Sequence, residues 1–193
     1  FNVDWKEKAV GEAKSLVNKF SSYSYKTIIE TLHKDLKFTK DEAVFGANNC
    51  GVEWNKEATR AARKYLTNSS YSRKRLIFQL QIFDYTLDEA AYAVDNCGAN
   101  WNKEALRAAK ELLQKDSFSY KGLIDQLERK DFTHQEAIWG VNNCNADWKI
   151  QAVKEAEKLL NINPCNSERM IFLLKISGFS NEEAEYAVKV LNL

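Results

Sequence analysis

The sequence has 193 residues, of which 45% are hydrophobic and 28% are charged. This composition is typical of a folded protein with a hydrophobic core, and it excludes a disordered chain. The formal net charge is only +1 and stays nearly balanced on both sides of Gly98, so nucleic acid and anionic membranes are unfavourable partners. A single proline and seven glycines leave few helix breakers. We therefore predict an all-α protein.

The sequence contains no predicted membrane segment or signal peptide. No stretch approaches the ~18 consecutive apolar residues of a membrane-spanning helix, and no charged and then apolar leader opens the chain. The first residue is Phe1 rather than methionine, so we expect a processed or trimmed chain. A leader, a lipid anchor and a tag are the alternatives for the part before it. Contact with a membrane is expected only through an anchor that this chain lacks.

Tryptophan residues mark an internal repeat. Trp5, Trp54, Trp101 and Trp148 are separated by 49, 47 and 47 residues, and each opens a similar run of residues, such as NWNKEALRAAKELL in the third case. Self-similarity at such a period is typical of tandem helical repeats. We predict four repeats, at residues 1–52, 53–99, 100–146 and 147–193.

Alternate repeats resemble each other more than neighbours do. The first and third repeats share SYSYKTII and SFSYKGLI, and both end in NNC. The second and fourth share LIF or MIF and the sequence YAV. The repeat is thus a duplicated pair, and the predicted pairs are residues 1–98 and 99–193.

Start signals predict three helices in each repeat, in a helix-turn-helix-like order. Before helix three, a Ser or Thr is followed three residues later by Glu, and an aromatic residue stands directly before this capping box. The four boxes are Thr39/Glu42, Thr86/Glu89, Thr133/Glu136 and Ser180/Glu183. Helix two is predicted to begin after four serine N-caps, namely Ser24, Ser72, Ser119 and Ser167.

The core of each repeat is predicted from the helical period. In helix one of the first repeat, Trp5, Ala9, Ala13 and Leu16 share one face and should form one buried stripe. Alanines recur at the centre of this stripe in every repeat and allow another helix to pack closely. A repeat of roughly 50 residues makes a marginal core alone, so neighbouring repeats are expected to support each other.

The cysteines suggest packing rather than chemistry. Cys50, Cys97 and Cys144 stand 47 residues apart on the predicted core face of helix three, where the fourth repeat has Leu191. Buried thiols acting as small hydrophobic side chains are favoured over a disulfide, and no spacing fits zinc. Cys165 is the exception because it lies in a loop, and a bridge from Cys144 to Cys165 is the first disulfide to consider.

No constellation of residues indicates an enzyme. The two histidines, His33 and His134, occupy different places in their repeats and have no metal-ligand spacing. The recurring carboxylates are already explained as helix caps, and no nucleophile elbow or glycine-rich phosphate loop is present. We predict a protein without catalytic activity, cofactor or metal.

One set of aromatic residues lacks a role in its own repeat. Phe45, Tyr92, Trp139 and Tyr186 lie two residues after the core alanine of helix three, about 200° round the helix. Two explanations remain open, namely packing between consecutive repeats and anchoring of a protein or peptide ligand. We expect Trp139 to pack against another repeat and Tyr186 to stay exposed, because no later repeat covers it.

The whole chain resembles the Ltp family of surface lipoproteins of Gram-positive bacteria. The resemblance rests on the opening pattern W-x3-A-x2-A, on S/T-x-x-E-A before an aromatic residue, and on YAVDN in the second repeat. It implies an extracellular protein, lipid-anchored or secreted, that binds a protein ligand. Prophage-encoded members block DNA injection by a superinfecting phage by engaging its tape-measure protein. A monomer is expected.

Two functions of other classes remain as alternatives. The helix-turn-helix-like order allows a nucleic-acid-binding protein, but helix three begins with KDEA, LDEA, HQEA or NEEA and would set carboxylates against phosphate. The one basic cluster belongs to the second repeat alone and comprises Arg60, Arg63, Lys64, Arg73, Lys74 and Arg75. The other alternative is a purely structural spacer of the cell envelope.

Overall fold

The computed structural model describes residues 4–19 and 23–193, so Phe1 lies outside the described residues. All regular secondary structure of the described part is helical, which confirms the all-α prediction. Its helices, in chain order, are α1 (Trp5–Lys19), α2 (Tyr25–Glu30), the π-helical segment η1 (Thr31–Asp35), α3 (Lys40–Asn49), α4 (Trp54–Asn68), α5 (Arg73–Ile82), α6 (Leu87–Asn96), α7 (Trp101–Lys115), α8 (Tyr120–Arg129), α9 (His134–Asn142), α10 (Trp148–Ile162), α11 (Ser167–Ile176) and α12 (Asn181–Val190).

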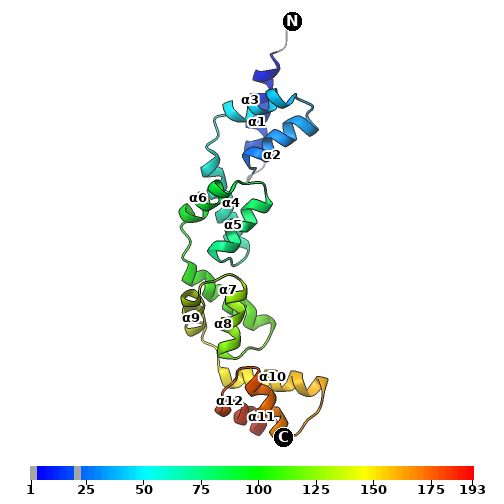
Figure 1. Ribbon diagram of the computed structural model, residues 1–193, viewed down its shortest axis with the longest axis vertical. Coiled ribbons are helices and arrows are strands. Elements are labelled where there is room, and N and C mark those ends of the chain that lie inside the picture. The colour runs from blue at the N-terminus through cyan, green and yellow to red at the C-terminus, as the bar shows by residue number, and fades with distance from the viewer. Residues whose placement is uncertain (1–3, 20–22) are drawn as a thin grey trace. The chain divides into compact units, whose positions relative to one another are not determined.

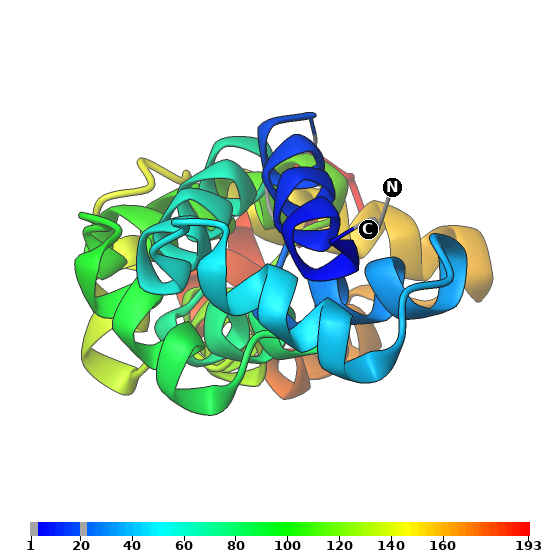
Figure 2. The same cartoon turned by 90° about the horizontal axis from the view of Figure 1, so that it is seen from above.

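The chain divides into two compact units. The first comprises Phe1–Ser69 and Arg73–Ala99, and the second comprises Ser70–Ser72 and Asn100–Leu193. Each unit contains two sets of three helices, so that helix one, helix two and helix three recur as α1 to α3, α4 to α6, α7 to α9 and α10 to α12 (Figure 1). Seen from above, the three helices of the first set, coloured dark blue to cyan, lie against one another (Figure 2).

The predicted capping boxes are confirmed at the start of all four third helices. In α3, the backbone N–H of Thr39 donates to the Glu42 carboxylate at 2.8 Å, and the Glu42 N–H donates back to the Thr39 hydroxyl at 3.3 Å. The aromatic residue before each box is buried, as a hydrophobic staple requires. These four residues are Phe38, Tyr85, Phe132 and Phe179.

The N-caps of helix two follow the prediction only in part. Ser24 and Ser119 accept from the backbone N–H three residues later, as expected. In the fourth repeat the prediction was wrong, because Asn166 is the N-cap and Ser167 is already the first residue of α11. Asn and Ser are equally good caps, so sequence alone did not decide between adjacent candidates.

Helices one and three pack most closely, because small residues face each other there. In the first repeat, Ala9, Ala13, Ala43 and Ala47 are almost completely buried, and Gly46 lies directly against the backbone of Ala9. Large side chains from helix two complete each core. They are Ile28 and Leu32, Leu76 and Leu80, Leu123 and Leu127, and Met170 and Leu174.

The first repeat is longer than the others partly because it contains the π-helical segment. From the buried Ile28 to the buried Phe38 there are ten positions, whereas the corresponding step from Leu76 to Tyr85 takes nine. The wider turn of η1 absorbs the additional residue, so that the Phe38 N–H still bonds to the carbonyl of Leu32, at 3.1 Å. This is how a π-bulge accommodates an insertion without displacing the residues on either side.

Tryptophans at the start of helix one join consecutive repeats inside each unit. Trp54 packs on the core of the first repeat and meets Tyr25 edge to face, with ring centroids 5.5 Å apart. In the second unit, Trp148 packs on the core of the third repeat and meets Tyr120 in the same way, also at 5.5 Å. The prediction that Trp5 is buried in the stripe of α1 was wrong, because this side chain is 50% exposed.

All four cysteines are free thiols. Cys50, Cys97 and Cys144 are buried, and each thiol bonds to the carbonyl oxygen three residues earlier, at 3.1 to 3.2 Å. The bridge between Cys144 and Cys165 that the sequence suggested is contradicted. Cys144 packs in the core of the third repeat, whereas Cys165 packs against the core of the fourth.

One staple residue carries a polar group that its equivalents lack. Tyr85 is 3% exposed, and its hydroxyl has no hydrogen-bond partner among the described residues, whereas the other three repeats have phenylalanine at this position. Burial also raises the pKa of Tyr85 far above the usual value, so the phenol stays neutral.

Replacing Tyr85 with phenylalanine should therefore stabilise the first unit by about 1 kcal/mol, because a buried hydroxyl without a partner is removed. The reverse change in the third repeat, Phe132→Tyr, is the matched control and should destabilise the second unit by a similar amount. Urea unfolding followed by circular dichroism measures both. A loss of stability on Tyr85→Phe would show that the hydroxyl is satisfied.

Candidate functional site

The described residues contain no group of three or more His, Cys, Asp or Glu side chains that is arranged to hold a metal ion. The two histidines are exposed and make local contacts. His33 bonds through Nδ1 to the carbonyl oxygen of Phe38 at 2.8 Å, and His134 bonds to Glu128 at 2.6 Å. Within the described ranges, no helix is long and apolar enough to cross a membrane.

The predicted aromatic residues of helix three all lie on the side away from the core. Tyr92 is 46% exposed, Trp139 37% and Tyr186 36%, while Phe45 is half-buried. The expected contrast between Trp139 and Tyr186 is therefore wrong, because neither side chain is covered more than the other. The helix-three row is defined here as Phe45, Tyr92, Trp139 and Tyr186.

Some members of the helix-three row do have contacts inside their own repeat, which the sequence did not reveal. The ammonium of Lys6 lies 5.2 Å from the ring centroid of Phe45, and that of Lys149 lies 5.6 Å from the ring of Tyr186. Both lysines stand directly after the tryptophan of helix one. Such cation–π contacts at exposed sites are worth about 0.5–1 kcal/mol.

Ion pairs with glutamates raise the pKa of two lysines near the helix-three row, Lys149 and Lys56. Lys149 donates to Glu182 at 2.7 Å, and this hydrogen bond raises the pKa of Lys149 and lowers that of Glu182. Near Tyr92, a hydrogen bond to Glu53 raises the pKa of Lys56 in the same way. Tyr186 and Tyr92 thus lie near exposed lysine–glutamate ion pairs, and no nucleophile or acid–base pair lies among these neighbours.

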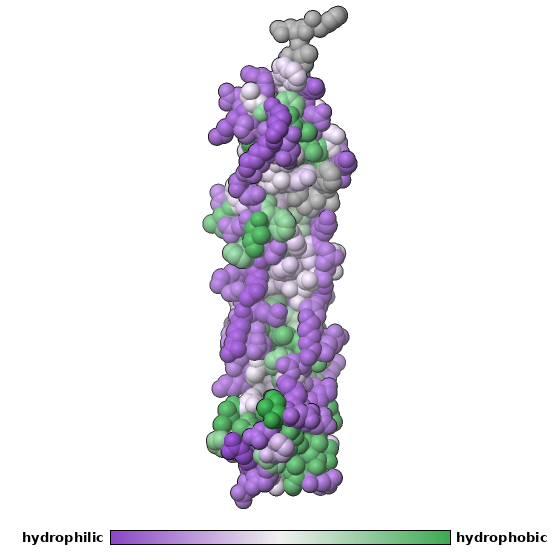
Figure 3. All heavy atoms as spheres, turned by 90° about the vertical axis from the view of Figure 1, so that its right-hand side faces the viewer, coloured by the Kyte–Doolittle hydropathy of each residue, from purple (hydrophilic) through white to green (hydrophobic). Residues whose placement is uncertain are grey.

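Sequence reasoning missed two exposed pairs of apolar residues, each made of a Phe and an Ile on helix two. Phe78 and Ile82 on α5 are 63% and 57% exposed, and the equivalent Phe172 and Ile176 on α11 are 60% and 68% exposed. These four residues are named the apolar helix-two faces. Hydrophobic atoms gather at the surface of the last repeat, at the foot of Figure 3. A signal was available, because each Phe stands two positions after a buried residue of helix two and must point away from the core.

Two arginines of the basic cluster of the second repeat bind partners within that repeat. Arg63 donates to the carbonyl oxygens of Asn96 and Cys97 at the end of α6, both at 3.2 Å. Arg73 forms a two-pronged bond to the Asp95 carboxylate, with both distances 2.9 Å. Because these two guanidinium groups already have partners, they give no support to a phosphate-binding surface.

A hollow of about 470 Å³ lies on the first repeat, and Tyr25, Ile29, His33 and Lys40 are among the residues that line it. Two further lysines at its edge are paired with carboxylates. Lys26 bonds to Asp84 at 2.5 Å and Lys34 to Glu30 at 3.1 Å. Because these lysines are paired, the lining of the hollow does not indicate a particular charged ligand.

A family model described as host cell surface-exposed lipoprotein matches the chain twice, at residues 53–97 and 100–144. These segments correspond to the second and third sets of three helices. No curated protein and no solved structure matches the chain.

Proposed function

We propose that this chain is a non-catalytic module that binds a protein partner at the cell surface, because its second and third repeats match the family model of host cell surface-exposed lipoproteins. The observation that supports binding is the exposure of large aromatic side chains on a rigid helical framework. Rigid aromatic residues contribute more than most to the energy of protein interfaces. The description of the matching family as host cell surface-exposed lipoproteins supports a location that external proteins can reach.

The finer proposal is exclusion of phage DNA. A protein at the outer face of the membrane that binds the tape-measure protein of an incoming phage tail would stop injection after adsorption. The chain needs no reaction chemistry for this, only a surface complementary to a segment of the tail protein. The acidic starts of the four third helices and the paired arginines of the second repeat support a protein partner over nucleic acid.

The test is expression of the anchored protein in a phage-sensitive Gram-positive host. If the proposal is right, phage should adsorb normally, whereas entry of phage DNA should fall sharply. A purified tail tape-measure protein should also bind the chain in solution. An unchanged efficiency of phage plating, together with no binding to tail proteins, would contradict the exclusion proposal. Normal adsorption of the phage would show that the protein acts after adsorption and does not block the receptor.

Trp139 tests the helix-three row as an anchor for that partner. With 37% of its surface exposed, Trp139 lies outside the buried core, so Trp139→Ala should change thermal unfolding only modestly. If it anchors a partner, the same change should weaken binding by about 2 kcal/mol. Isothermal titration and differential scanning calorimetry measure the two effects. A large loss of stability without loss of affinity would assign Trp139 to packing alone.

A further inference from the structure

We propose that this chain associates head to tail with a second copy of itself, with the first repeat of one copy seated on the fourth repeat of the next. The contact would reproduce the junction that already links consecutive repeats inside each unit. The proposal goes beyond the proposed function and does not depend on it. It also departs from the monomer that we expected from the sequence.

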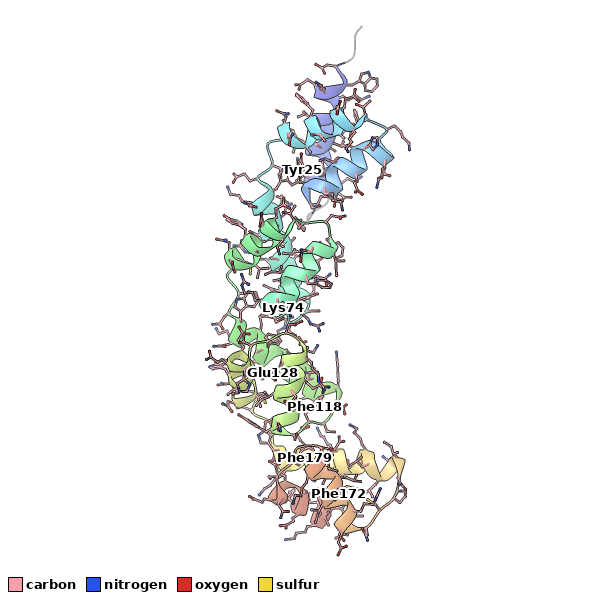
Figure 4. All side chains as sticks on the ribbon, in the orientation of Figure 1. Tyr25, Lys74, Phe118, Glu128, Phe172 and Phe179 are labelled. Atoms are coloured by element: carbon pink, nitrogen blue, oxygen red, sulfur yellow. The ribbon has the colours of Figure 1, made fainter. Side chains whose placement is uncertain are left out.

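Each junction inside a unit joins a receiving repeat, whose core is covered, to an entering repeat, which supplies a tryptophan. In the first unit, Trp54 at the start of α4 enters and packs on the core of the first repeat, beside Tyr25 (Figure 4). In the second unit, Trp148 enters the third repeat in the same way. In both receiving repeats the N-cap of helix two is buried, since Ser24 is 0% and Ser119 1% exposed.

The entering side of the first repeat is uncovered. Trp5 is 50% exposed, whereas the equivalent Trp54 and Trp148 are half-buried. Its ring meets Phe38 at 6.3 Å and the ammonium of Lys8 at 4.8 Å, and both of these residues belong to the first repeat. An exposed indole is a large apolar surface that gains free energy on burial. Trp5 is therefore available to enter a receiving repeat.

The receiving side of the fourth repeat is uncovered too. Partly buried apolar side chains border its core, as they do in the first and third repeats, but no tryptophan of the described ranges packs on it. The N-cap Asn166 is exposed, whereas its equivalents Ser24 and Ser119 are buried. Leu191 is only partly buried, although it stands where the other repeats have buried cysteines. The fourth repeat thus presents the side that a tryptophan covers in the other receiving repeats.

Two further positions face each other across these junctions. In the first unit, Lys26 of the receiving repeat donates to Asp84 of the entering repeat at 2.5 Å. Asp84 lies in the turn before α6 and has a positive φ of 64°. The same two positions in the second unit are Lys121 and Gly178, and a Cβ atom added to Gly178 would lie 3.7 Å from that of Lys121. The facing arrangement is therefore a property of the junction.

Both charges are reversed on the two uncovered sides. The fourth repeat has Glu168 at the position of Lys26, and the first repeat has Lys37 at the position of Asp84, again with a φ of 64°. Glu168 and Lys37 form no ion pair within residues 4–19 and 23–193, although the Lys37 ammonium donates one of its three N–H groups to the Lys34 carbonyl oxygen at 2.7 Å. Had only one position changed, like charges would oppose the contact. Two reversals that preserve complementarity favour a second copy as the occupant.

The order of the repeats agrees with this contact. In the chain, the third repeat follows the second, and these resemble the first and the fourth repeats respectively. Seating a first repeat on a fourth therefore continues the alternation. Because a head-to-tail contact uses two different surfaces, it adds further copies until a ring closes. Such an assembly would present several helix-three rows together, and a partner with several binding sites would gain a factor of about 10²–10⁴ in avidity.

Sedimentation equilibrium of the full chain, between about 10 µM and 1 mM, measures the association. The average mass should rise with concentration and pass that of two copies, because each added copy keeps one uncovered side. Trp5→Ala should weaken the association at least about thirtyfold, since it removes the entering tryptophan. A chain that stays monomeric over this range would overturn the proposal.

A different contact between copies would also be recognised. A mass that levels off at two copies, and that falls on Phe78→Glu with Ile82→Lys rather than on Trp5→Ala, would assign the contact to the apolar helix-two faces. That result would overturn the head-to-tail junction.

The reversed pair allows a charge-swap test with residues taken from sister repeats. Glu168→Lys copies the first repeat and Lys37→Asp copies the second, and both positions are exposed, so the fold should be unchanged. Each change alone sets like charges against each other and should weaken association at least about tenfold. The double variant rebuilds the arrangement of Lys26 and Asp84 and should restore it. Circular dichroism checks that every variant folds.

Mixing the two single variants gives the sharpest reading. Each variant then carries the charge that the other needs, so the mixture should associate although neither variant does so alone at the same concentration. Folded variants that associate like the unchanged chain, or a double variant and a mixture that both fail to associate, would overturn the pairing of Glu168 with Lys37.

Discussion

Replacing Trp148 with alanine should lower the free energy of unfolding of the second unit by about 3 kcal/mol or more. The indole packs against the core of the third repeat although it belongs to the fourth, and it meets the ring of Tyr120 nearly at right angles, 85°. Its removal should leave part of that core uncovered. Guanidinium unfolding followed by circular dichroism, fitted for both units, measures the loss.

Trp5 provides the control within the same chain. It occupies the same position of helix one, but it is 50% exposed, and its described ring contact is with Phe38 of its own repeat, at 6.3 Å. Trp5→Ala should therefore cost the first unit about 1 kcal/mol or less. Equal costs at Trp5 and Trp148 would mean that the tryptophan stabilises its own helix rather than the junction between repeats.

Gly46→Ala should destabilise the first unit by about 1–3 kcal/mol, although alanine is the better helix former. A Cβ atom at Gly46 would lie 2.8 Å from both the carbonyl carbon and the carbonyl oxygen of Ala9, and backbone atoms cannot move aside as the end of a side chain can. Helices α1 and α3 would have to separate. Thermal unfolding of the purified variant gives the change.

Gly11 is the matched control on α1 of the same repeat. Its added Cβ meets nothing within 4 Å, and the position is exposed in the middle of the helix. Gly11→Ala should therefore stabilise the unit by about 0.5–1 kcal/mol through helix propensity. Two glycines in one helix pair would then respond with opposite signs, and a gain at Gly46 would show that the close approach relaxes at no cost.

The sequence predicts the helices well because their start signals are local. The capping box at Thr39 and the staple at Phe38 involve residues close in the chain, so a pattern of a few letters defines them. The additional residue in helix two of the first repeat was not located from sequence. The position of a π-helical turn depends on which side chains before and after it must remain buried. Burial is decided by packing against other helices, which a local sequence pattern does not describe.

The exposed fraction of aromatic side chains outside the core is harder to predict from sequence. The helical period correctly places Trp139 and Tyr186 away from the core, but their residual exposure depends on neighbouring helices that the period does not describe. Phe78 and Phe172 escaped notice because they stand among buried residues in the runs LIF and MIF, where apolar composition alone suggests core. Comparison of equivalent positions in the repeats would have identified them as surface residues. The first repeat has the charged residue Glu30 at the position of Phe78.

The short junctions inside each unit should protect the chain from proteolytic cleavage. In the first unit, only a few residues separate the buried Cys50 from Trp54, and both side chains are held by the core of the first repeat. A protease must draw several consecutive residues into an extended form before it can cut, and local unfolding of this junction would first have to release the tryptophan. The loop before α11 is different, because Ile162 at its start is 82% exposed and Asn163 and Pro164 are exposed as well. Limited digestion should therefore nick the chain there and leave the joint between the first two repeats intact.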